Sequence, residues 1–437
     1  MNGIDLNIVD WTSLTESQRL QALARPKQLN DPKLFADVQA IIGRVQKQGD
    51  KALLDYNRTF DGVSLTELAV SEAEFTQAER DVPDEIKQAM RQAMQRITRW
   101  HKAGMAKEFS VKTAQGVRCG RIIRPIQRVG LYIPAGSAPL PSTVLMLGIP
   151  ALLAQCPEVL ICTPAQKDGS VHPAILVAAR LCGISKVYKT GGAQAIAAMA
   201  LGTERIGACA KIFGPGNAYV SVAKQLVQSL PGSPAIDMPA GPSEVLVIAD
   251  AKANAGFVAA DLLAQAEHGP DSQVVCISTS AVKLKQVERA LAEQLKTLPR
   301  HTITTKALTH ARLIKTRSLR EAIDISNRYA PEHLILAVED AERLLDSVQA
   351  AGSVFIGAWA SESLGDYCSG TNHTLPTNGY ARAYSGVSVA SFQLNISTQR
   401  VSPKGLKAIG PCAETLARCE RLEAHARSVS IRLQALA

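Results

Sequence analysis

Gln265 and His268 stand at the end of a segment, residues 254–265, whose pattern predicts a helix. Side chains three residues apart share a helix face, and an amide oxygen and an imidazole nitrogen can both reach one borderline metal ion such as zinc. An ordinary helix end is the alternative, because His268 is favourable near the negative end of the helix dipole and Gly269 suits a helix cap. The spacing alone leaves both interpretations open.

Glu332 and His333 directly precede an apolar run, and their types suit acid and base chemistry. Adjacent side chains of an extended chain point to opposite sides, so the two could serve two different steps. An imidazole with a pKa near ~6.5 can remove a proton from a hydroxyl group, and a carboxylate can activate a water molecule. A solvated strand entrance is the alternative for this pair.

A third segment, residues 361–373, is unusually rich in small and polar residues. Polar loops beside sheets commonly form sites. Within the segment, Asp366 offers an oxygen ligand for a metal, and His373 offers a second cationic or hydrogen-bonding group. We therefore favour a functional role for this segment over a purely structural one.

The tail carries Glu420 and His425 in a charged segment, residues 404–436, whose pattern predicts helix. A separation of five residues is about 140° around a helix. The two can meet one ligand only if the ligand lies across the helix or if the helix ends between them. Taken alone, a histidine on a charged helix is usually solvated. Because little sequence remains to bury this arm, we expect it to dock on another subunit of a homodimer.

Two glycine-containing turns could bind a dinucleotide, although the sequence has no G-x-G-x-x-G fingerprint. Residues 191–194 (Gly-Gly-Ala-Gln) precede a predicted helix, and residues 213–217 (Phe-Gly-Pro-Gly-Asn) follow a predicted strand. Turns that open towards helix N-termini suit phosphate and ribose groups, but glycine turns also occur for packing reasons. Each turn is weak evidence by itself.

The hydrophobic pattern predicts the elements that position these residues. The first ~110 residues read as helices, with capping-box spacing at Thr15 and Gln18 and at Ser71 and Glu74. From about residue 129, apolar runs alternate with helical segments, which predicts βαβ units and mainly parallel sheets. The strand candidates are 129–134, 159–163, 186–190, 211–213, 244–249, 273–279, 333–338 and 353–356, and the helix candidates between them are 173–181, 194–201, 254–265 and 283–295. A glycine- and proline-rich stretch, residues 231–242, marks a domain junction in a chain of 437 residues.

Composition excludes several classes of protein. The net charge is +9, yet no two Lys or Arg residues are adjacent and aromatic residues make up only 4%, so a nucleic-acid-binding face is not expected. The N-terminus is acidic and lacks the apolar region of a signal peptide, and the longest apolar stretch, residues 144–154, is too short to span a membrane. The nine cysteines show no C-x-x-C spacing and favour a reduced compartment. We expect a cytoplasmic protein without nucleic-acid or membrane partners.

Read in order, these segments resemble the histidinol dehydrogenase family over nearly the whole chain. The most specific segments are GLYIPAGSAPLPSTVLML (130–147), VYKTGGAQAIAAMALGTE (187–204), KIFGPGN (211–217), IDMPAGPSEVLVIAD (236–250), LLAQAEHGPDSQ (262–273), PEHL (331–334) and GDYCSGTNHTLPT (365–377). The resemblance implies a zinc-dependent, NAD-linked oxidoreductase that converts L-histidinol into L-histidine through a bound aldehyde.

The resemblance also implies a role for each matching residue. The zinc ligands would be Gln265, His268, Asp366 and, from the partner subunit, His425, with one zinc per subunit. The substrate contacts would be Ser243, Gln265, His268, His333, Asp366, His373, Glu420 and His425, with Glu420 also crossing from the partner subunit. Tyr132, Gln194 and Asn217 match cofactor contacts, and Glu332 and His333 match the catalytic acid/base pair.

The expected architecture is α/β, with two incomplete Rossmann-like α/β/α domains whose sheets are mainly parallel. Residues 1–27 form an N-terminal helical segment. Residues 28–131 and 243–380 form a discontinuous substrate and zinc domain, and residues 132–242 form the NAD-binding domain. Residues 381–437 form a helical arm that crosses to the partner subunit.

Other interpretations predict different activities. A zinc hydrolase would use Glu332 to activate a metal-bound water and would need no NAD, but the chain lacks H-E-x-x-H. An aldehyde dehydrogenase that uses a thiolate would depend on Cys368, and the neighbouring carboxylate of Asp366 disfavours a thiolate there. A metal-dependent binding module would bind histidinol without reducing NAD, and an NAD-linked dehydrogenase would act on a related imidazole or amino alcohol.

Overall fold

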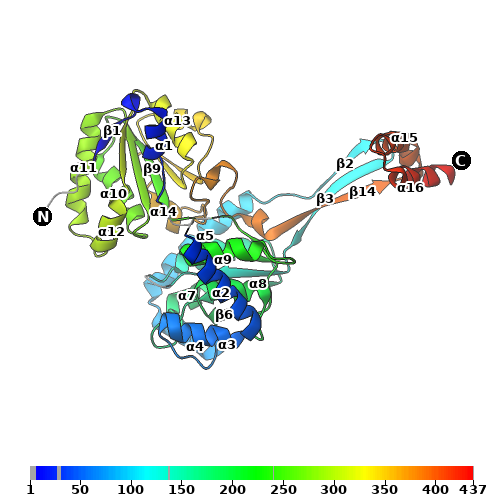
Figure 1. The fold of residues 1–437 in the computed structure, drawn as a ribbon, viewed down its shortest axis with the longest axis horizontal. Helices are drawn as coiled ribbons and strands as arrows, with labels where there is room; N and C mark the ends of the chain where they lie inside the picture. Colours follow the sequence, from blue (N-terminus) through cyan, green and yellow to red (C-terminus); the bar gives the residue numbers. More distant parts are fainter. Residues whose placement is uncertain (1–5, 27–30, 136–137, 240, 437) are drawn as a thin grey trace.

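The structure, a computed structural model, describes residues 6–26, 31–135, 138–239 and 241–436. Two α/β bodies adjoin each other, and a long arm projects from them (Figure 1). Each body is built on one parallel sheet, with six strands in one and five in the other. The predicted α/β class with mainly parallel sheets is confirmed.

The six-stranded sheet has the order β1-β11-β10-β9-β12-β13, and every neighbouring pair is parallel. Its strands are β1 (Ile8–Asp10), β9 (Glu244–Ala249), β10 (Gln273–Ser278), β11 (Arg312–Lys315), β12 (His333–Ala337) and β13 (Ser353–Ile356). One apolar cluster packs a face of the sheet against α10 (Ala255–Ala266), α11 (Ala281–Leu295) and α12 (His301–Leu308). A second cluster packs the other face against α13 (Leu319–Tyr329) and the residues around α1 (Glu16–Ala22). Every residue of β9 and β10 is buried, as expected for central strands covered on both faces.

The five-stranded sheet has the order β6-β5-β4-β7-β8, also parallel throughout. Its strands are β4 (Arg128–Tyr132), β5 (Glu158–Thr163), β6 (Lys186–Lys189), β7 (Lys211–Phe213) and β8 (Ala235–Ile236). Helices α6 (Pro141–Leu153) and α7 (Pro173–Leu181) cover one face, and α8 (Gly192–Leu201) and α9 (Ala218–Gln228) cover the other. Because β8 lies inside the predicted junction 231–242, the chain crosses to the other body only after this strand.

The predicted grouping of residues 28–131 with 243–380 is wrong for the helices of the first segment. Helix α2 (Pro32–Gln48) packs on α8 and α9, α4 (Glu72–Asp81) packs on α7, and α5 (Asp84–Ala103) packs on α6, so all three extend the five-stranded body. The short α3 (Asp50–Tyr56) follows α2 on the same side. The apolar stripe of α2 is buried in the same cluster as α8 and α9. The N-terminal segment, predicted as helical, also contributes β1 to the edge of the six-stranded sheet.

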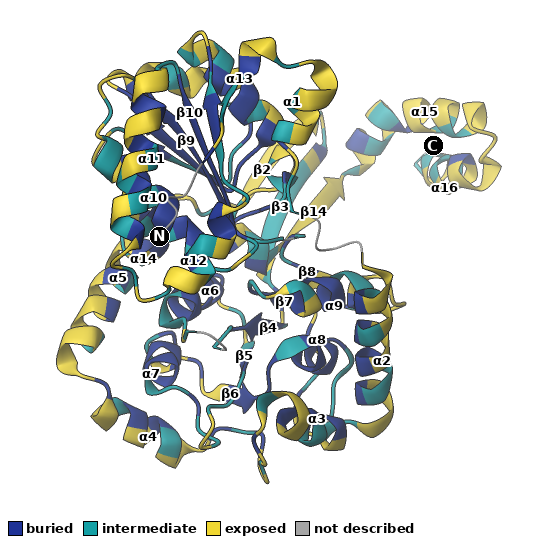
Figure 2. Ribbon diagram, turned by 60° about the vertical axis from the view of Figure 1, so that its left-hand side comes forward, coloured by how far each residue is buried: buried dark blue, intermediate teal, exposed yellow. Residues whose placement is uncertain are grey.

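The arm combines a three-stranded antiparallel sheet with two terminal helices. The sheet has the order β14-β3-β2 and is formed by β2 (Phe109–Ala114), β3 (Val117–Pro125) and β14 (Gln393–Val401). Helices α15 (Pro403–Cys419) and α16 (Glu423–Gln434) pack on each other at its end, far from both bodies (Figure 1). Among the described residues of these two helices, only Gly405, Gly410 and Ala426 are buried, whereas both bodies have buried interiors (Figure 2).

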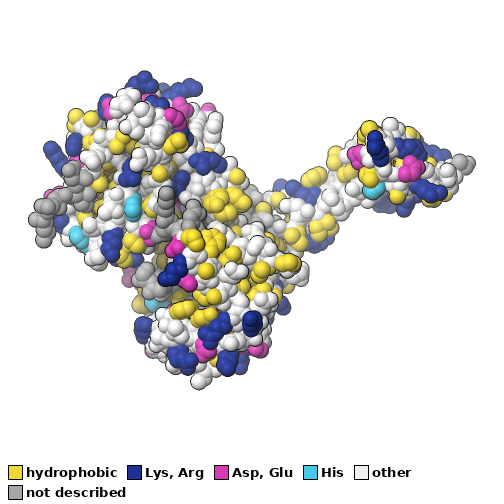
Figure 3. Space-filling view, viewed as in Figure 1, with side chains coloured by type: hydrophobic (Ala, Val, Ile, Leu, Met, Phe, Trp, Pro, Cys, Tyr) yellow, Lys and Arg dark blue, Asp and Glu magenta, His cyan; other side chains and the backbone are white. Residues whose placement is uncertain are grey.

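The visible surface shows no single basic face. On the side drawn in Figure 3, Lys and Arg side chains are scattered over both bodies and the arm among hydrophobic and uncharged groups. Within the described residues, no helix has the length and apolar character needed to cross a membrane.

Candidate active site

The residues predicted to do chemistry gather at the amino edge of the six-stranded sheet. Glu332 and His333 stand at the start of β12, which begins in register with β9. Gln265 lies in the last turn of α10, which runs back towards that edge, and His268 follows the end of this helix by two residues; α14 (Glu362–Tyr367) carries Asp366. Ligands of open α/β sheets more often bind outside the carboxyl ends of the strands, so this cluster uses the opposite edge.

His333 lies at the centre of the cluster, and its side chain is 3% exposed. Its Nδ1 lies 3.2 Å from Oε1 of Gln265 and, because an amide oxygen only accepts, Nδ1 donates in this contact. Its Nε2 lies 3.4 Å from Asp366, and its Nδ1 lies 3.8 Å from carboxylate oxygens of both Glu332 and Glu362. Burial favours the neutral imidazole, but the carboxylates outweigh it and raise the pKa of His333 to about 10.

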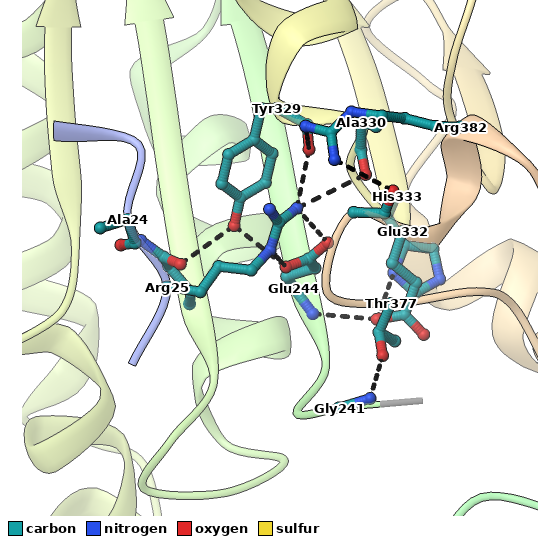
Figure 4. Close-up of polar contacts among 12 residues, drawn as sticks. Ala24, Arg25, Gly241, Glu244, Tyr329, Ala330, Glu332, His333, Thr377 and Arg382 are labelled. Atoms are coloured by element: carbon teal, nitrogen blue, oxygen red, sulfur yellow. Dashed lines mark hydrogen bonds and ion pairs between the residues drawn. The ribbon is translucent and has the colours of Figure 1, made fainter. Parts of the chain in front are cut away.

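Glu332 is buried, and its carboxylate has one backbone partner. Oε2 accepts a hydrogen bond of 2.9 Å from the backbone N–H of Glu244 at the start of β9 (Figure 4). Burial raises the pKa of Glu332 to about 8. A general acid or base works best when its pKa is close to the pH at which the enzyme operates, so this value suits proton transfer. Ser243, a predicted substrate contact, directly precedes Glu244 at the same edge and is half-buried.

A set of three side chains could hold a metal ion. The ligand atoms of His268, Glu362 and Asp366 all lie within 4.8 Å of one another. His268 is exposed, whereas both carboxylates are buried. In the described part of the chain, both carboxyl oxygens of Glu362 lack a hydrogen-bond partner, and so does Nε2 of Gln265. Imidazole nitrogen and carboxylate or amide oxygen are ligands that zinc accepts, so the residues present fit a zinc ion.

Glu362 is the member of this set that the sequence analysis did not single out. It stands four residues before Asp366 in α14, and this spacing places both carboxylates on one face of the helix. Burial raises the pKa of Glu362 well above its ordinary value. The four-residue spacing inside a polar segment was the available signal, and two carboxylates on one helix face are common without function.

His373 connects the cluster to the other body. Its Nδ1 donates to the backbone oxygen of Asp366 at 2.9 Å, and its Nε2 lies 3.1 Å from the hydroxyl of Thr143 in α6. The side-chain N–H of the neighbouring Asn372 donates to the backbone oxygen of Met146 at 2.6 Å. The polar loop therefore contacts both bodies.

The predicted cofactor residues lie at the carboxyl edge of the five-stranded sheet. Tyr132 ends β4, and its buried hydroxyl accepts from the N–H of Gly192 at 3.1 Å. Gln194 is buried in the first turn of α8, and Asn217 caps α9 through its side-chain oxygen. A Cβ at Gly214, where φ is +121°, would lie 2.1 Å from the backbone oxygen of Tyr132, so close packing is one reason for this glycine.

The structure does not bring the two predicted arm residues to this cluster within one chain. Glu420 directly follows α15, and His425 lies in the first turn of α16. The helix thus ends between them, which is one of the two arrangements that the sequence left open. Both side chains are exposed at the tip of the arm.

Fold and site together define a two-domain α/β enzyme with a buried acid/base pair beside a candidate metal site. The family model described as histidinol dehydrogenase matches residues 24–433. Histidinol dehydrogenase of Xanthomonas campestris pv. campestris is 57% identical over 98% of this chain and 99% of its own length. The protein of that name from Pectobacterium atrosepticum is 50% identical over 98% and 96%. The crystal structure of histidinol dehydrogenase from Elizabethkingia anophelis superposes with a TM-score of 0.95 at 48% identity, covering 100% and 99% of the two chains. The chain therefore belongs to the histidinol dehydrogenase family, as the sequence segments indicated.

Proposed function

We propose that this chain catalyses the four-electron, NAD-linked oxidation of L-histidinol to L-histidine, the last steps of histidine biosynthesis, through a bound L-histidinaldehyde. The observation that carries the proposal is the buried pair Glu332 and His333 beside the zinc-compatible side chains of the same edge. The names of the similar proteins and of the similar crystal structure support the same substrate.

One zinc per subunit would be held by Gln265, His268 and Asp366, together with His425 of the partner subunit. Zinc, when bound, would supply a Lewis acid for the imidazole and amino nitrogens of the substrate, and its charge beside the carboxylates near His333 would lower the pKa of that imidazole towards the range of a base. NAD, when bound, would supply the acceptor for the hydride that leaves the carbinol carbon. Tyr132, Gln194 and Asn217 would contact this cofactor in the body that contains residues 132–242.

His333 and Glu332 divide the proton transfers between them. His333 takes the hydroxyl proton of histidinol as the first hydride leaves, which produces the aldehyde. Glu332 takes a proton from the water that adds to the aldehyde, and the second hydride leaves the hydrate to give the acid. An aldehyde that stays bound between the two oxidations is protected from side reactions.

The rest of the site would come from two subunits of a homodimer. Ser243 and His373 contact the substrate from the body, and Glu420 of the partner subunit contacts it from the arm. The exposed position of the arm tip supports this arrangement, because its own chain leaves these side chains free to meet another surface. The protein would act in the cytoplasm.

The test is NADH formation from L-histidinol by purified protein, with and without a chelator. Two NADH per histidinol consumed, lost on chelation and restored by zinc, is the expected result. Turnover without NAD would support the hydrolase interpretation instead. A zinc-loaded dimer that makes no NADH would mean that this chain acts on another substrate, and histidinol binding without reduction would point to a binding module.

A further inference from the structure

Arg25 joins the N-terminal segment to the strand ends of the site through a buried ion pair (Figure 4). Its side chain is 16% exposed, and that of Glu244 is 3% exposed. Nε of the guanidinium lies 2.5 Å from one carboxylate oxygen of Glu244, and Nη2 lies 2.8 Å from the other. A two-pronged contact of this kind fixes the orientation of both groups as well as balancing their charges.

The same guanidinium holds the end of helix α13. Its Nη2 donates to the backbone oxygen of Tyr329 at 2.8 Å, and its carbon lies 3.8 Å from the centre of the Tyr329 ring. The next residue, Ala330, has φ +55° and ψ +69°, a left-handed conformation that residues other than glycine rarely adopt. A cation bound to the last carbonyls of a helix stabilises such a turn, and this turn leads directly to Glu332.

A second route joins Arg25 to the same carboxylate. The backbone N–H that Glu332 accepts belongs to Glu244, whose side chain Arg25 binds. The hydroxyl of Tyr329 lies 3.1 Å from the Glu244 carboxylate, so the two routes are also linked to each other. One guanidinium therefore sets both the backbone turn before Glu332 and the position of its hydrogen-bond donor.

We infer that Arg25 is a positioning residue for Glu332. Its partners are Glu244, Tyr329 and Ala330, so it acts on the reaction through them. The inference rests on the proposed function, in which Glu332 activates the water that hydrates the aldehyde. Loss of the guanidinium fork then slows the second oxidation more than the first.

The experiment uses the full-length protein with Arg25→Lys, which keeps the charge but cannot bind both carboxylate oxygens and the helix carbonyl in one plane. In a single turnover of bound histidinol, the first and second NADH are timed separately. We expect the second to slow by about 10–100-fold, with the KM for histidinol and the first NADH changed by less than about threefold. The crystal structure of the variant is expected to show the Glu332 carboxylate displaced from the N–H of Glu244.

The matched control is Arg328→Lys. Arg328 also ties the N-terminal segment to the end of α13, through an exposed ion pair with Glu16, and it has no contact with Glu244 among those described. This variant is expected to leave both oxidations unchanged. If it slows the second oxidation as much as Arg25→Lys does, a general loosening of α13 explains the result and the inference is wrong.

Three results for the Arg25→Lys variant itself would also overturn the inference. They are an equal loss in both oxidations, a normal second oxidation, or an undisplaced Glu332 carboxylate in the variant. If Arg25→Lys does not fold, the double variant Arg25→Met with Glu244→Gln removes both charges together and is held to the same criteria. If the wild-type protein makes no NADH from histidinol, the proposed function fails, and the crystal structure still decides whether Arg25 positions Glu332.

Discussion

At the amino edge of the six-stranded sheet, the ring of His333 is 3% exposed and has polar neighbours at both nitrogens. At the tip of the arm, His425 is exposed, and α15 and α16 pack mainly on each other. The surroundings of the first histidine orient it before any ligand binds. Among the described residues, the chain that carries the second histidine supplies no such surroundings, so in the proposed dimer the partner subunit would orient it.

The difference indicates what the arm needs in order to work. A metal or substrate contact requires a side chain held within narrow limits, which buried neighbours provide in the body. The two arm helices and the turn between them expose large apolar side chains, including Leu416, Leu422 and Ile431, that docking would cover. A partner body that covers them would fix Glu420 and His425 at the same time.

Mixing two inactive variants is expected to restore activity, which is the largest effect we predict. His333→Asn removes the proposed base from the body, and His425→Asn removes the proposed metal ligand from the arm. If each site takes its body from one subunit and its arm from the other, a heterodimer of the two variants has one unaltered site. Random re-association should make about a quarter of all sites active, measured as NADH formation. No recovery from confirmed heterodimers would show that each arm serves its own subunit.

The matched control carries both substitutions in one chain and is mixed with wild-type protein. In the shared arrangement, each heterodimer site contains one substitution, so only wild-type dimers work, and about a quarter of the sites remain active. In the unshared arrangement, about half of them remain active. The shared arrangement therefore gives more activity than the unshared one in the first mixture and less activity in the second.

Glu362→Gln is expected to weaken the body half of the site without unfolding it. The amide keeps the shape of the side chain but replaces one oxygen of a buried carboxyl group, which lies 3.8 Å from His333 and within the candidate metal set, by an NH2 group that cannot bind a metal ion. We expect zinc affinity or kcat to fall by about 10–100-fold, measured by chelator competition and by NADH formation at saturating zinc. Glu339→Gln, in an exposed ion pair of the same body, is the control for the change from carboxyl to amide. Unchanged zinc affinity and kcat would remove Glu362 from the site.

His101 tests whether burial in the body also couples its histidines to folding. The ring is buried in α5, its Nε2 accepts from Asn372 at 3.2 Å, and burial lowers its pKa to about 4. Since the unfolded chain binds this proton near pH ~6.5, the stability that His101 contributes is present above that pH and is lost as pH falls towards 4. When the pH falls from ~6.5 to ~5, the unfolding free energy of the wild type should decrease by up to about 2 kcal/mol more than that of His101→Gln. Urea unfolding at the two pH values measures this, and parallel losses would contradict it.

The parallel part of the fold could be predicted because its signals are local. The strands predicted at 211–213, 244–249 and 353–356 coincide with β7, β9 and β13, and both predicted capping boxes are present. Buried strands have apolar runs bounded by polar residues, and these are visible in the sequence. The arm sheet has no such signal, because β14 is almost wholly exposed and pairs with residues 117–125, far away in the sequence. The packing of α2 on the five-stranded body is likewise decided by contacts between distant segments.

Prediction of the site followed the same division. Gln265, Glu332 and His333 were found because polar residues interrupt apolar patterns, and the structure does bring them together. Glu362 and Arg25 were not found, because their importance depends on which strand end each side chain reaches. That placement is set by the return of α14 and of the N-terminal segment to the six-stranded sheet, and neither return is visible in local sequence.

Cys368→Ser is expected to have the smallest effect, with kcat within about twofold of the wild type. Cys368 directly follows α14 and packs partly against the apolar cluster of the five-stranded body. The nearby His373 has both ring nitrogens engaged, by Asp366 and Thr143, so it offers no free base to the thiol. Iodoacetamide should modify the exposed arm thiols, Cys412 and Cys419, before Cys368, and NADH formation should survive in the serine variant. A loss of about a thousandfold, together with an acyl adduct on Cys368, would instead mean that the second oxidation proceeds through a covalent thiol intermediate, with Glu332 in a supporting role.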